Sequence, residues 1–242
     1  MNLNDKTILV SGANRGIGRA TVEALLAEDV AKIYATARNT DDLPDFRDPR
    51  VVPLQLDITD SQSIGRAAQT ANDVDALINN AGVLHIGSLL EQSNEEIAAN
   101  FDTNFYGTLN VIREFVPVLE SKQDASIVNV VTIAAFVNFP GLGGYSASKA
   151  ALFSLSQGIR TELAPRGISV HTINPGPIDT DMTRDMPFDK ASVVETGRNI
   201  VAGLKNGEAD IFPDAGSQQM FDVWSGNYRD LEQVVFDMHH AA

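Results

Sequence analysis

The sequence predicts a single α/β domain with a doubly wound, seven-stranded parallel sheet flanked by helices. Short runs of β-branched and apolar residues alternate with helical patterns along the chain, which is typical of repeated strand–helix units. A glycine-rich turn stands between the first run and the first helical pattern. No repeat, low-complexity tract or linker divides the 242 residues, and single α/β domains routinely reach about 250 residues. We therefore treat 1–242 as one domain.

Seven segments are predicted to be strands because each combines β-branched and apolar residues between turn signals. They span 7–10, 32–35, 51–56, 76–78, 126–131, 168–173 and 209–212. Helical patterns fill the intervals, since parallel strands need a crossover connection. These patterns cover 16–28, 60–71, 94–121 with a break, 145–164, 191–204 and 217–238.

Two connecting segments stand out in the sequence. The segment 37–50 is polar and contains two prolines, so we expect a surface loop. The segment of approximately 176–200 begins with prolines and methionines. We expect it to form a lid over a binding site.

The composition argues against several classes of function. The formal net charge is −14 and the sequence pI is about 4.5, so nucleic acid and anionic membranes are repelled on average. The chain has no Cys, which excludes disulfides and thiolate metal sites. None of its four His has a ligand spacing such as H-E-x-x-H, so we expect no metal. Since no signal-peptide pattern occurs either, we expect a cytoplasmic protein with no nucleic-acid or membrane partner.

The segment Tyr145-Ser-Ala-Ser-Lys149 carries the most informative chemistry. Residues four apart on a helix lie on one side, so Tyr145 and Lys149 can act as a proton-handling pair. Such a pair indicates chemistry on a carbonyl or an alcohol, although in isolation it is more often an exposed helix face. Other motifs accompany it in order along the chain: Ser11-Gly-Ala-Asn-Arg-Gly-Ile-Gly18, Asn79-Asn-Ala-Gly82, Asn104 and Asn174-Pro-Gly-Pro-Ile-Asp-Thr180.

Together these motifs resemble the classical short-chain dehydrogenase/reductase family over nearly the whole chain. The resemblance implies a Rossmann-like fold and hydride transfer between a nicotinamide and a carbonyl or alcohol. It implies that Tyr145 is the general acid or base and that Lys149 binds the nicotinamide ribose and lowers the Tyr145 pKa. Asn104 would hold a water that links Lys149 to solvent. The catalytic residues implied in this way are Asn104, Thr132, Tyr145 and Lys149.

The glycine-rich turn is the expected phosphate site. Glycines there let backbone N–H groups approach a pyrophosphate at a helix N-terminus. By resemblance, cofactor contacts continue along the chain to the segment after the sixth strand. The implied cofactor-binding residues are Gly12, Asn14, Arg15, Gly16, Ile17, Gly18, Arg38, Asp57, Ile58, Asn80, Gly82, Tyr145, Lys149, Pro175, Ile178 and Thr180.

The end of the second predicted strand indicates the form of the cofactor. A carboxylate there binds the ribose 2′-OH of NAD, whereas an Arg accommodates the 2′-phosphate of NADP. Ala37 stands where NAD-specific relatives have Asp, Arg38 follows it, and Arg15 lies within the glycine turn. Two guanidinium groups can bind one phosphate, so we expect NADP(H).

Thr132 departs from the family pattern. The family has a Ser thirteen residues before the Tyr, whose hydroxyl holds the substrate oxygen, and Thr132 occupies that position. Thr keeps a hydroxyl, but its methyl group stiffens χ1 and takes space beside the substrate. Two interpretations stay open: a working donor in an altered pocket, or a strand residue left in a nucleotide-binding regulatory protein with lost or weak catalysis.

The expected pocket walls are mainly apolar, which suits a small apolar or aromatic ketone, aldehyde or secondary alcohol. The alternative is that several of these residues only pack the lid against the core. They are Ala134, Phe136, Val137, Phe139, Leu142, Met182, Met186 and Phe188.

The C-terminal region is atypical for the family. After Asp214 the chain lacks the V-D-G-G type of ending and continues through Trp224 into an acidic helix at approximately 217–238. Small residues such as Ala147, Ala151 and Gly158 permit close packing between helices. By analogy we expect a homo-oligomer, either a dimer or a tetramer.

Overall fold

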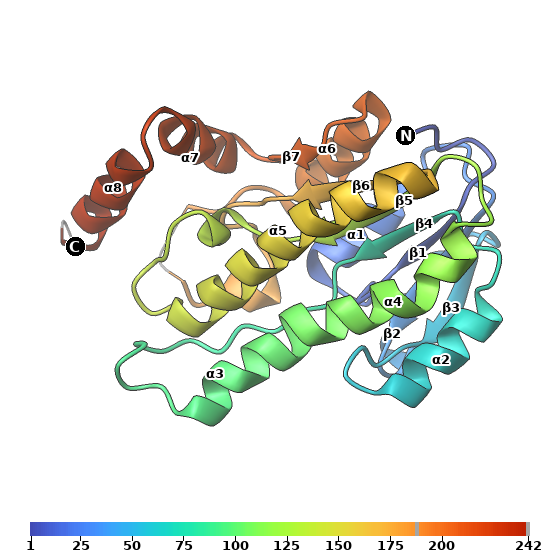
Figure 1. Ribbon diagram of the computed structural model, residues 1–242, viewed down its shortest axis with the longest axis horizontal. Helices are drawn as coiled ribbons and strands as arrows, with labels where there is room; N and C mark the ends of the chain where they lie inside the picture. Colours follow the sequence, from blue (N-terminus) through green and yellow to red (C-terminus); the bar gives the residue numbers. More distant parts are fainter. Residues whose placement is uncertain (187–188, 241–242) are drawn as a thin grey trace.

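The computed structural model describes residues 1–186 and 189–240. Within them, seven parallel strands form one sheet in the order β3-β2-β1-β4-β5-β6-β7, as Figure 1 shows. The strands are β1 (Thr7–Val10), β2 (Lys32–Ala37), β3 (Val51–Gln55), β4 (Ala76–Asn79), β5 (Ala125–Val130), β6 (Ile168–Ile173) and β7 (Asp210–Ile211). The predicted doubly wound seven-stranded sheet is confirmed.

The helices alternate with the strands along the chain. The α-helices are α1 (Gly16–Leu25), α2 (Ser61–Thr70), α3 (Asn94–Phe101), α4 (Thr108–Leu119), α5 (Gly143–Leu163), α6 (Val193–Asn206), α7 (Ala215–Gly226) and α8 (Tyr228–His240). A π-helical segment, η2 (Asp102–Gly107), joins α3 to α4. Single turns of 3₁₀-helix form η1 (Thr40–Asp42), η3 (Ile133–Ala135), η4 (Ala164–Arg166) and η5 (Asp181–Thr183).

Two apolar cores lie on the two faces of the sheet. On one face Val22 of α1 and Ile200 of α6 pack over Ile8, and on the other Phe115 of α4 and Ile64 of α2 pack over Leu9. Ile8 and Leu9 are adjacent in β1, and both are fully buried. Successive residues of a strand point to opposite faces, so a strand covered by helices on both sides has apolar residues at consecutive positions, as Ile8 and Leu9 show.

Among the predicted elements, a helix break and the last strand are confirmed, and one helix is wrong. The break expected within 94–121 is the π-helical segment η2. The single helix expected over 217–238 is wrong, because α7 ends at Gly226 and α8 begins at Tyr228 after an extended residue, Asn227 (φ −159°, ψ 114°). The last strand is confirmed but has only two residues, and α6 begins at Val193, within the predicted lid.

The two strands at the edges of the sheet are β3 and β7. Pro53 lies within β3, opposite Ala35 of β2. Proline has no N–H to donate to a ladder, and within sheets it is confined to such edge positions. No helix in the described residues is long and apolar enough to span a membrane.

Candidate active site

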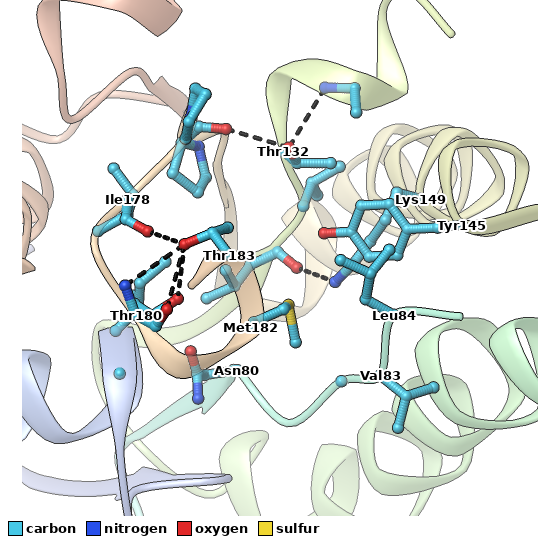
Figure 2. A pocket seen from close by; sticks show the side chains of 18 of the residues that line it. Asn80, Val83, Leu84, Thr132, Tyr145, Lys149, Ile178, Thr180, Met182 and Thr183 are labelled. Atoms are coloured by element: carbon cyan, nitrogen blue, oxygen red, sulfur yellow. Dashed lines mark hydrogen bonds between the residues drawn. The ribbon is translucent and has the colours of Figure 1, made fainter. Parts of the chain in front are cut away.

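A cavity of about 990 Å³ lies along the carboxyl ends of the strands, and Figure 2 shows part of its lining. Each of β1 to β6 is followed by a segment that contributes to it. The central contributors include Gly12 after β1, Asn80 after β4 and Thr132 after β5. Ligands of open α/β sheets bind at this edge, where the strand order reverses.

The turn between β1 and α1 has the backbone conformation that glycine allows. Gly12 and Gly16 have φ values of +65° and +55°, in the left-handed region that other L-residues rarely adopt. Gly18 permits a close approach instead, because a Cβ atom there would lie 2.3 Å from the Gly12 carbonyl oxygen. The three glycines therefore make one compact turn.

Ser11 and Asn80 hold this turn against β4. The Ser11 Oγ accepts hydrogen bonds from the backbone N–H groups of Asn80 (2.9 Å) and Ala81 (3.0 Å). The Asn80 side chain donates in return to the carbonyls of Ser11 (2.9 Å) and Gly12 (3.0 Å). The Ser11 hydroxyl thus fixes the turn to the segment that follows β4, a role that the glycine motif alone does not reveal.

The N-terminus of α1 fits a phosphate group. No side chain caps it, and its first turn contains no acidic residue. The first N–H groups of a helix lack partners within the helix and carry a partial positive charge, so they bind anions. Gly16 and Ile17 of this turn line the cavity.

Arg15 and Arg38 both line the cavity, together with Asp42. The Arg15 guanidinium is exposed and lies 3.6 Å from Asp181 of η5. The Arg38 carbonyl oxygen accepts a hydrogen bond from Gln55 (3.0 Å). Asp57 also lines the cavity, and its pKa is lowered chiefly because Thr59 donates a side-chain hydrogen bond to it.

Tyr145 lies in the first turns of α5, and its side chain lines the cavity beside Lys149 (Figure 2). Burial raises the pKa of Tyr145 to about 12, although a hydrogen bond with Thr132 acts in the opposite direction. The expectation that Lys149 lowers this pKa stays a prediction, because burial is the main cause of the shift here. The Lys149 Nζ lies 6.0 Å from the centre of the tyrosine ring, and desolvation of the phenolate dominates.

Lys149 is almost completely buried, with 4% of its surface exposed. Its Nζ donates a hydrogen bond of 2.7 Å to the carbonyl of Val130. Burial lowers the pKa of Lys149 to about 8, because desolvation disfavours the ammonium form. The lysine therefore lies between Tyr145 and the end of β5, with a proton that is easier to release than in water.

The Thr132 hydroxyl lies at the end of β5 and lines the same cavity. It donates to the carbonyl of Pro175 (3.1 Å) and accepts from the N–H of Ala134 (3.2 Å). The Thr132 hydroxyl also acts to lower the pKa of Tyr145, against the larger effect of burial. A hydroxyl is thus present at the position where the family pattern has Ser.

Asn104 lies in the π-helical segment and does not line the cavity. Its amide donates to the Val83 carbonyl (3.0 Å) and to Ser148 Oγ (3.0 Å), and its oxygen accepts from the Val83 N–H (2.9 Å). π-Helical turns occur frequently at functional sites. Here the side chain fixes the irregular segment that follows β4 to α5, and its role in a proton relay stays a prediction.

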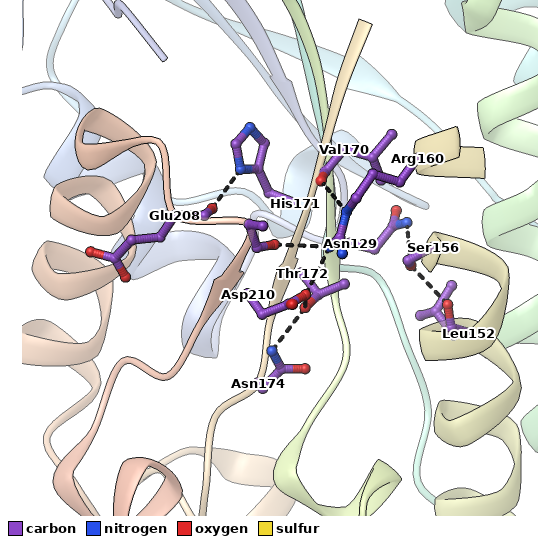
Figure 3. Close-up of polar contacts among 11 residues, drawn as sticks. Asn129, Leu152, Ser156, Arg160, Val170, His171, Thr172, Asn174, Glu208 and Asp210 are labelled. Atoms are coloured by element: carbon purple, nitrogen blue, oxygen red, sulfur yellow. Dashed lines mark hydrogen bonds and ion pairs between the residues drawn. The ribbon is translucent and has the colours of Figure 1, made fainter. Parts of the chain in front are cut away.

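Buried polar contacts fasten α5 to the sheet, as Figure 3 shows. Asn129 of β5 donates to Ser156 of α5 (2.9 Å) and accepts from Asn79 of β4 (2.9 Å). Further along α5, Arg160 donates to the carbonyl of Val170 (2.9 Å) and pairs with Asp210 of β7 (2.7 Å). Buried polar groups tolerate little displacement because unpaired partners are costly. The helix that carries Tyr145 and Lys149 therefore has a fixed register on the sheet.

The segment after β6 closes over the glycine turn. Thr180 lies 3.4 Å from the position that a Cβ of Gly16 would occupy. Thr183 donates a short hydrogen bond to the carbonyl of Ile178, and Asp179 donates from its backbone to the Ala191 carbonyl (2.9 Å). Pro175, Ile178 and Thr180 all line the cavity.

The cavity brings together all the predicted site residues except Gly18 and Asn104. Among the expected apolar walls, Ala134, Phe139, Leu142, Met182 and Met186 line it. The prediction for Phe136 and Val137 is wrong, because Phe136 packs against the aromatic rings of Phe153 and Trp224, and Val137 packs against α8. Phe188 lies outside the described residues.

Sequence reasoning missed the contribution of the last two helices. Met220 of α7 and Val235, Met238 and His239 of α8 line the cavity. Leu231, Val235 and Met238 are spaced i, i+4, i+7, which is the pattern of one helix face. That spacing was the available signal, but it does not reveal what the face contacts.

Comparisons with known proteins agree with this geometry. The family model described as short chain dehydrogenase matches residues 6–191. The chain is 31% identical over 218 residues to the 3-oxoacyl-(acyl-carrier-protein) reductase of Escherichia coli, covering 87% of this chain and 88% of that enzyme. It is 33% identical over 192 residues to carbonyl reductase (NADPH) 2 of Sus scrofa, covering 78% of each.

A solved structure is similar over almost the full length. It is a short chain dehydrogenase from Burkholderia cenocepacia in complex with NADP, with a TM-score of 0.91 and 37% sequence identity. The match covers 97% of this chain and 99% of that one. The likeness therefore extends beyond the segment matched by the family model, into α7 and α8.

Proposed function

The chain belongs to the short chain dehydrogenase family of oxidoreductases, and on that premise we propose an NADP(H)-dependent enzyme. It would transfer hydride between the nicotinamide and a ketone, aldehyde or secondary alcohol that carries an apolar or aromatic group. The observation that supports this most directly is the shared cavity: Tyr145, Lys149 and Thr132 line the same space as the glycine turn. The residue roles below are part of the proposal.

When bound, NADPH would supply the hydride and NADP⁺ would accept it. Tyr145 would protonate the substrate oxygen during reduction. Its pKa of about 12 keeps the phenol protonated at neutral pH, which is the form that an acid requires. Alcohol oxidation instead needs the phenolate, so the protein without cofactor is better prepared for reduction.

Lys149 and Thr132 would assist the phenol. Lys149 has three donors, of which one binds the Val130 carbonyl, so others are available for a ribose hydroxyl. The Thr132 hydroxyl would turn from the Pro175 carbonyl toward the substrate oxygen and position it against Tyr145. A preorganised donor of this kind commonly contributes about 10² to 10³ in rate.

The preference for NADP(H) is supported by the two arginines that line the cavity and by the absence of a carboxylate at Ala37. A guanidinium binds phosphate strongly, whereas a carboxylate at that position would repel it. The Burkholderia cenocepacia protein described above binds NADP. Asp42 also lines this end of the cavity, so the arginines must outweigh its charge.

The experiment that tests this function is a screen of ketones and alcohols with each cofactor. We expect turnover with NADPH to exceed turnover with NADH, and Arg38→Asp to reverse the ratio, because the new carboxylate repels the 2′-phosphate and accepts the ribose 2′-OH. Arg66→Asp, an exposed exchange on α2 that does not line the cavity, is the matched control. Equal use of NADH and NADPH by the unmodified protein would contradict the preference.

The substrate class is supported by the apolar side chains around Tyr145, among them Phe139, Leu142 and Met182. Apolar pockets with few polar groups select apolar ligands. A preference for charged substrates in the same screen would contradict this class. We also propose a homo-oligomer, and a cytoplasmic location that agrees with a chain without Cys.

A regulatory protein that binds the nucleotide without turnover is the less favoured alternative. It depended on Thr132 as a lost catalytic group, yet Thr132 keeps a hydroxyl and lines the same cavity as Tyr145. NADPH binding without turnover across a broad carbonyl panel would favour it.

A further inference from the structure

The far end of the cavity is built by a part of the chain that no motif predicts. Met220 of α7 and Val235, Met238 and His239 of α8 line it. The family model ends at residue 191, so all four residues lie beyond the matched segment. These residues are therefore not explained by the family pattern.

A chain of contacts connects this wall to the reacting groups. Thr132 caps η3, which leads to Phe139, and Phe139 lines the cavity. Phe139 and Met220 pack against the cluster formed by Val137, Leu231 and Val235. The α8 wall thus packs against the segment that follows β5 and leads from Thr132, and it lines the same cavity as Tyr145.

One face of α8 changes from core to cavity wall along its length. Leu231 is completely buried and Val235 is 5% exposed, whereas Met238 is 47% exposed although it continues the same face. The i, i+3 and i, i+4 spacings place Met238 beside Val235. The apolar side chain of Met238 therefore lies at the cavity and is covered by little protein. An apolar ligand bound there would shield this side chain from water.

We propose that Met238 contacts the substrate and determines how large an apolar group the cavity accepts. The inference rests on the proposed function and deepens it, because it predicts preference for carbonyl compounds with a long alkyl or aryl group over small ones. Met side chains are flexible and polarizable and adapt to irregular apolar surfaces. The wall would fit extended apolar groups of varied shape.

The test compares the truncation of one methionine with the truncation of one phenylalanine, both on α8. Phe236 is 54% exposed, stacks on His240 and does not line the cavity, so Phe236→Ala is the matched control for Met238→Ala. We measure kcat and KM with NADPH for methyl ketones that range from butanone to methyl nonyl ketone. Melting temperatures of both variants verify that the fold is retained.

For Met238→Ala we expect kcat/KM for methyl nonyl ketone to fall roughly tenfold, mainly through a higher KM, since one lost apolar contact changes discrimination by about 10- to 200-fold at most. Butanone, which is too short to reach the wall, should be unaffected, and Phe236→Ala should behave as the unmodified protein. An equal loss for all ketones, or an equal loss in both variants, would overturn the inference.

A binding measurement separates this inference from the proposed function. Trp224 is the single tryptophan of the chain and packs against the cluster that contains Leu231 and Val235. If no ketone is turned over, the proposed function fails. Titration with methyl nonyl ketone, followed by Trp224 fluorescence, then tests whether the α8 wall binds an apolar ligand. Weaker binding in Met238→Ala alone supports the inference, whereas no binding, or the same affinity in all three proteins, overturns it.

Discussion

Burial sets the acid–base properties of Tyr145 and Lys149. Both groups are held in their neutral forms more strongly than in water, with pKa values of about 12 and about 8. The same desolvation means that a charged group of a bound ligand would interact strongly with Tyr145 and Lys149, because little water screens the charges. The pair is therefore prepared to change protonation when a ligand fills the cavity.

The lowered pKa of Lys149 has a measurable effect on stability. The folded protein releases this proton near pH 8, whereas the unfolded chain keeps it up to its ordinary pKa of 10.5. Between these values the unfolded state binds more protons, so the free energy of unfolding rises with pH. From pH 8 to 10 the contribution of Lys149 should be about 2 kcal/mol.

The measurement is urea unfolding of the unmodified protein and of Lys149→Met at pH 8 and pH 10. The unmodified protein should gain about 2 kcal/mol over the variant across this interval. Above pH 10 the raised pKa of Tyr145 acts in the other direction, because the unfolded chain then loses the phenol proton first. Parallel stability profiles of the two proteins would show that Lys149 is not desolvated as described.

Thr132 provides a second prediction for a single residue. Thr132→Ala removes the hydroxyl that lies by Tyr145 and Pro175, and we expect kcat to fall about 10² to 10³-fold. Thr132→Ser keeps the donor and should retain most activity, with a changed KM because the methyl group is gone. Steady-state kinetics check both variants, and if both match the unmodified enzyme, Thr132 has no catalytic role.

At the scale of elements, the turn between β1 and α1 behaves as one unit. A Cβ at position 18 would lie 2.3 Å from the Gly12 carbonyl oxygen and 2.4 Å from the Asn80 amide. Gly18→Ala should therefore displace both groups and weaken NADPH binding at least about tenfold, equal to about 1.4 kcal/mol. Titration of NADPH fluorescence measures this.

Gly65→Ala is the matched control for that prediction. Gly65 lies inside α2, and the nearest atom to an added Cβ is 4.0 Å away. The exchange should leave NADPH affinity unchanged and stabilise the helix by up to about 1 kcal/mol. Equal NADPH affinities of Gly18→Ala and the unmodified protein would show that the turn accommodates the added methyl group without weaker cofactor binding.

The regular elements of the sheet follow from the sequence, whereas the C-terminal helices do not. The strands β1 and β6 have the predicted bounds because their β-branched and apolar residues are almost all buried, which is typical of a parallel sheet covered on both faces. The separation of α7 from α8 depends on Gly226 and Asn227, a weak turn signal that also occurs inside helices. The short β7 depends on tertiary contacts, namely its pairing with β6 and the hydrogen bonds of Asp210 with Arg160 and Thr172.

The candidate site was predictable to different degrees at its two ends. The glycine turn and the Tyr145 and Lys149 pair belong to motifs with fixed spacing, and the fold brings them together. Phe136 and Val137 were misplaced because apolar residues after a strand can face either the cavity or a neighbouring helix, and only tertiary packing decides. The α8 wall has no motif, since any apolar helix face with that spacing looks the same in sequence.

At the scale of the molecule, the outer face of α5 is open at Gly158, where an added Cβ would meet no atom within 4 Å. Gly158→Arg should leave the protomer folded but prevent close packing of two such helices, so a homodimer formed through α5 should dissociate. Light scattering with size-exclusion chromatography measures the mass. Gly226→Arg, on α7 and equally open, is the control, and unchanged assembly in both would place the interface elsewhere.

The two edges of the sheet limit how copies of this chain can join. β3 contains Pro53, and β7 offers only two residues to a neighbour. Neither edge presents a long row of free backbone N–H and C=O groups with which a strand of another chain could pair. Aggregation by strand addition is therefore disfavoured at both edges of the sheet.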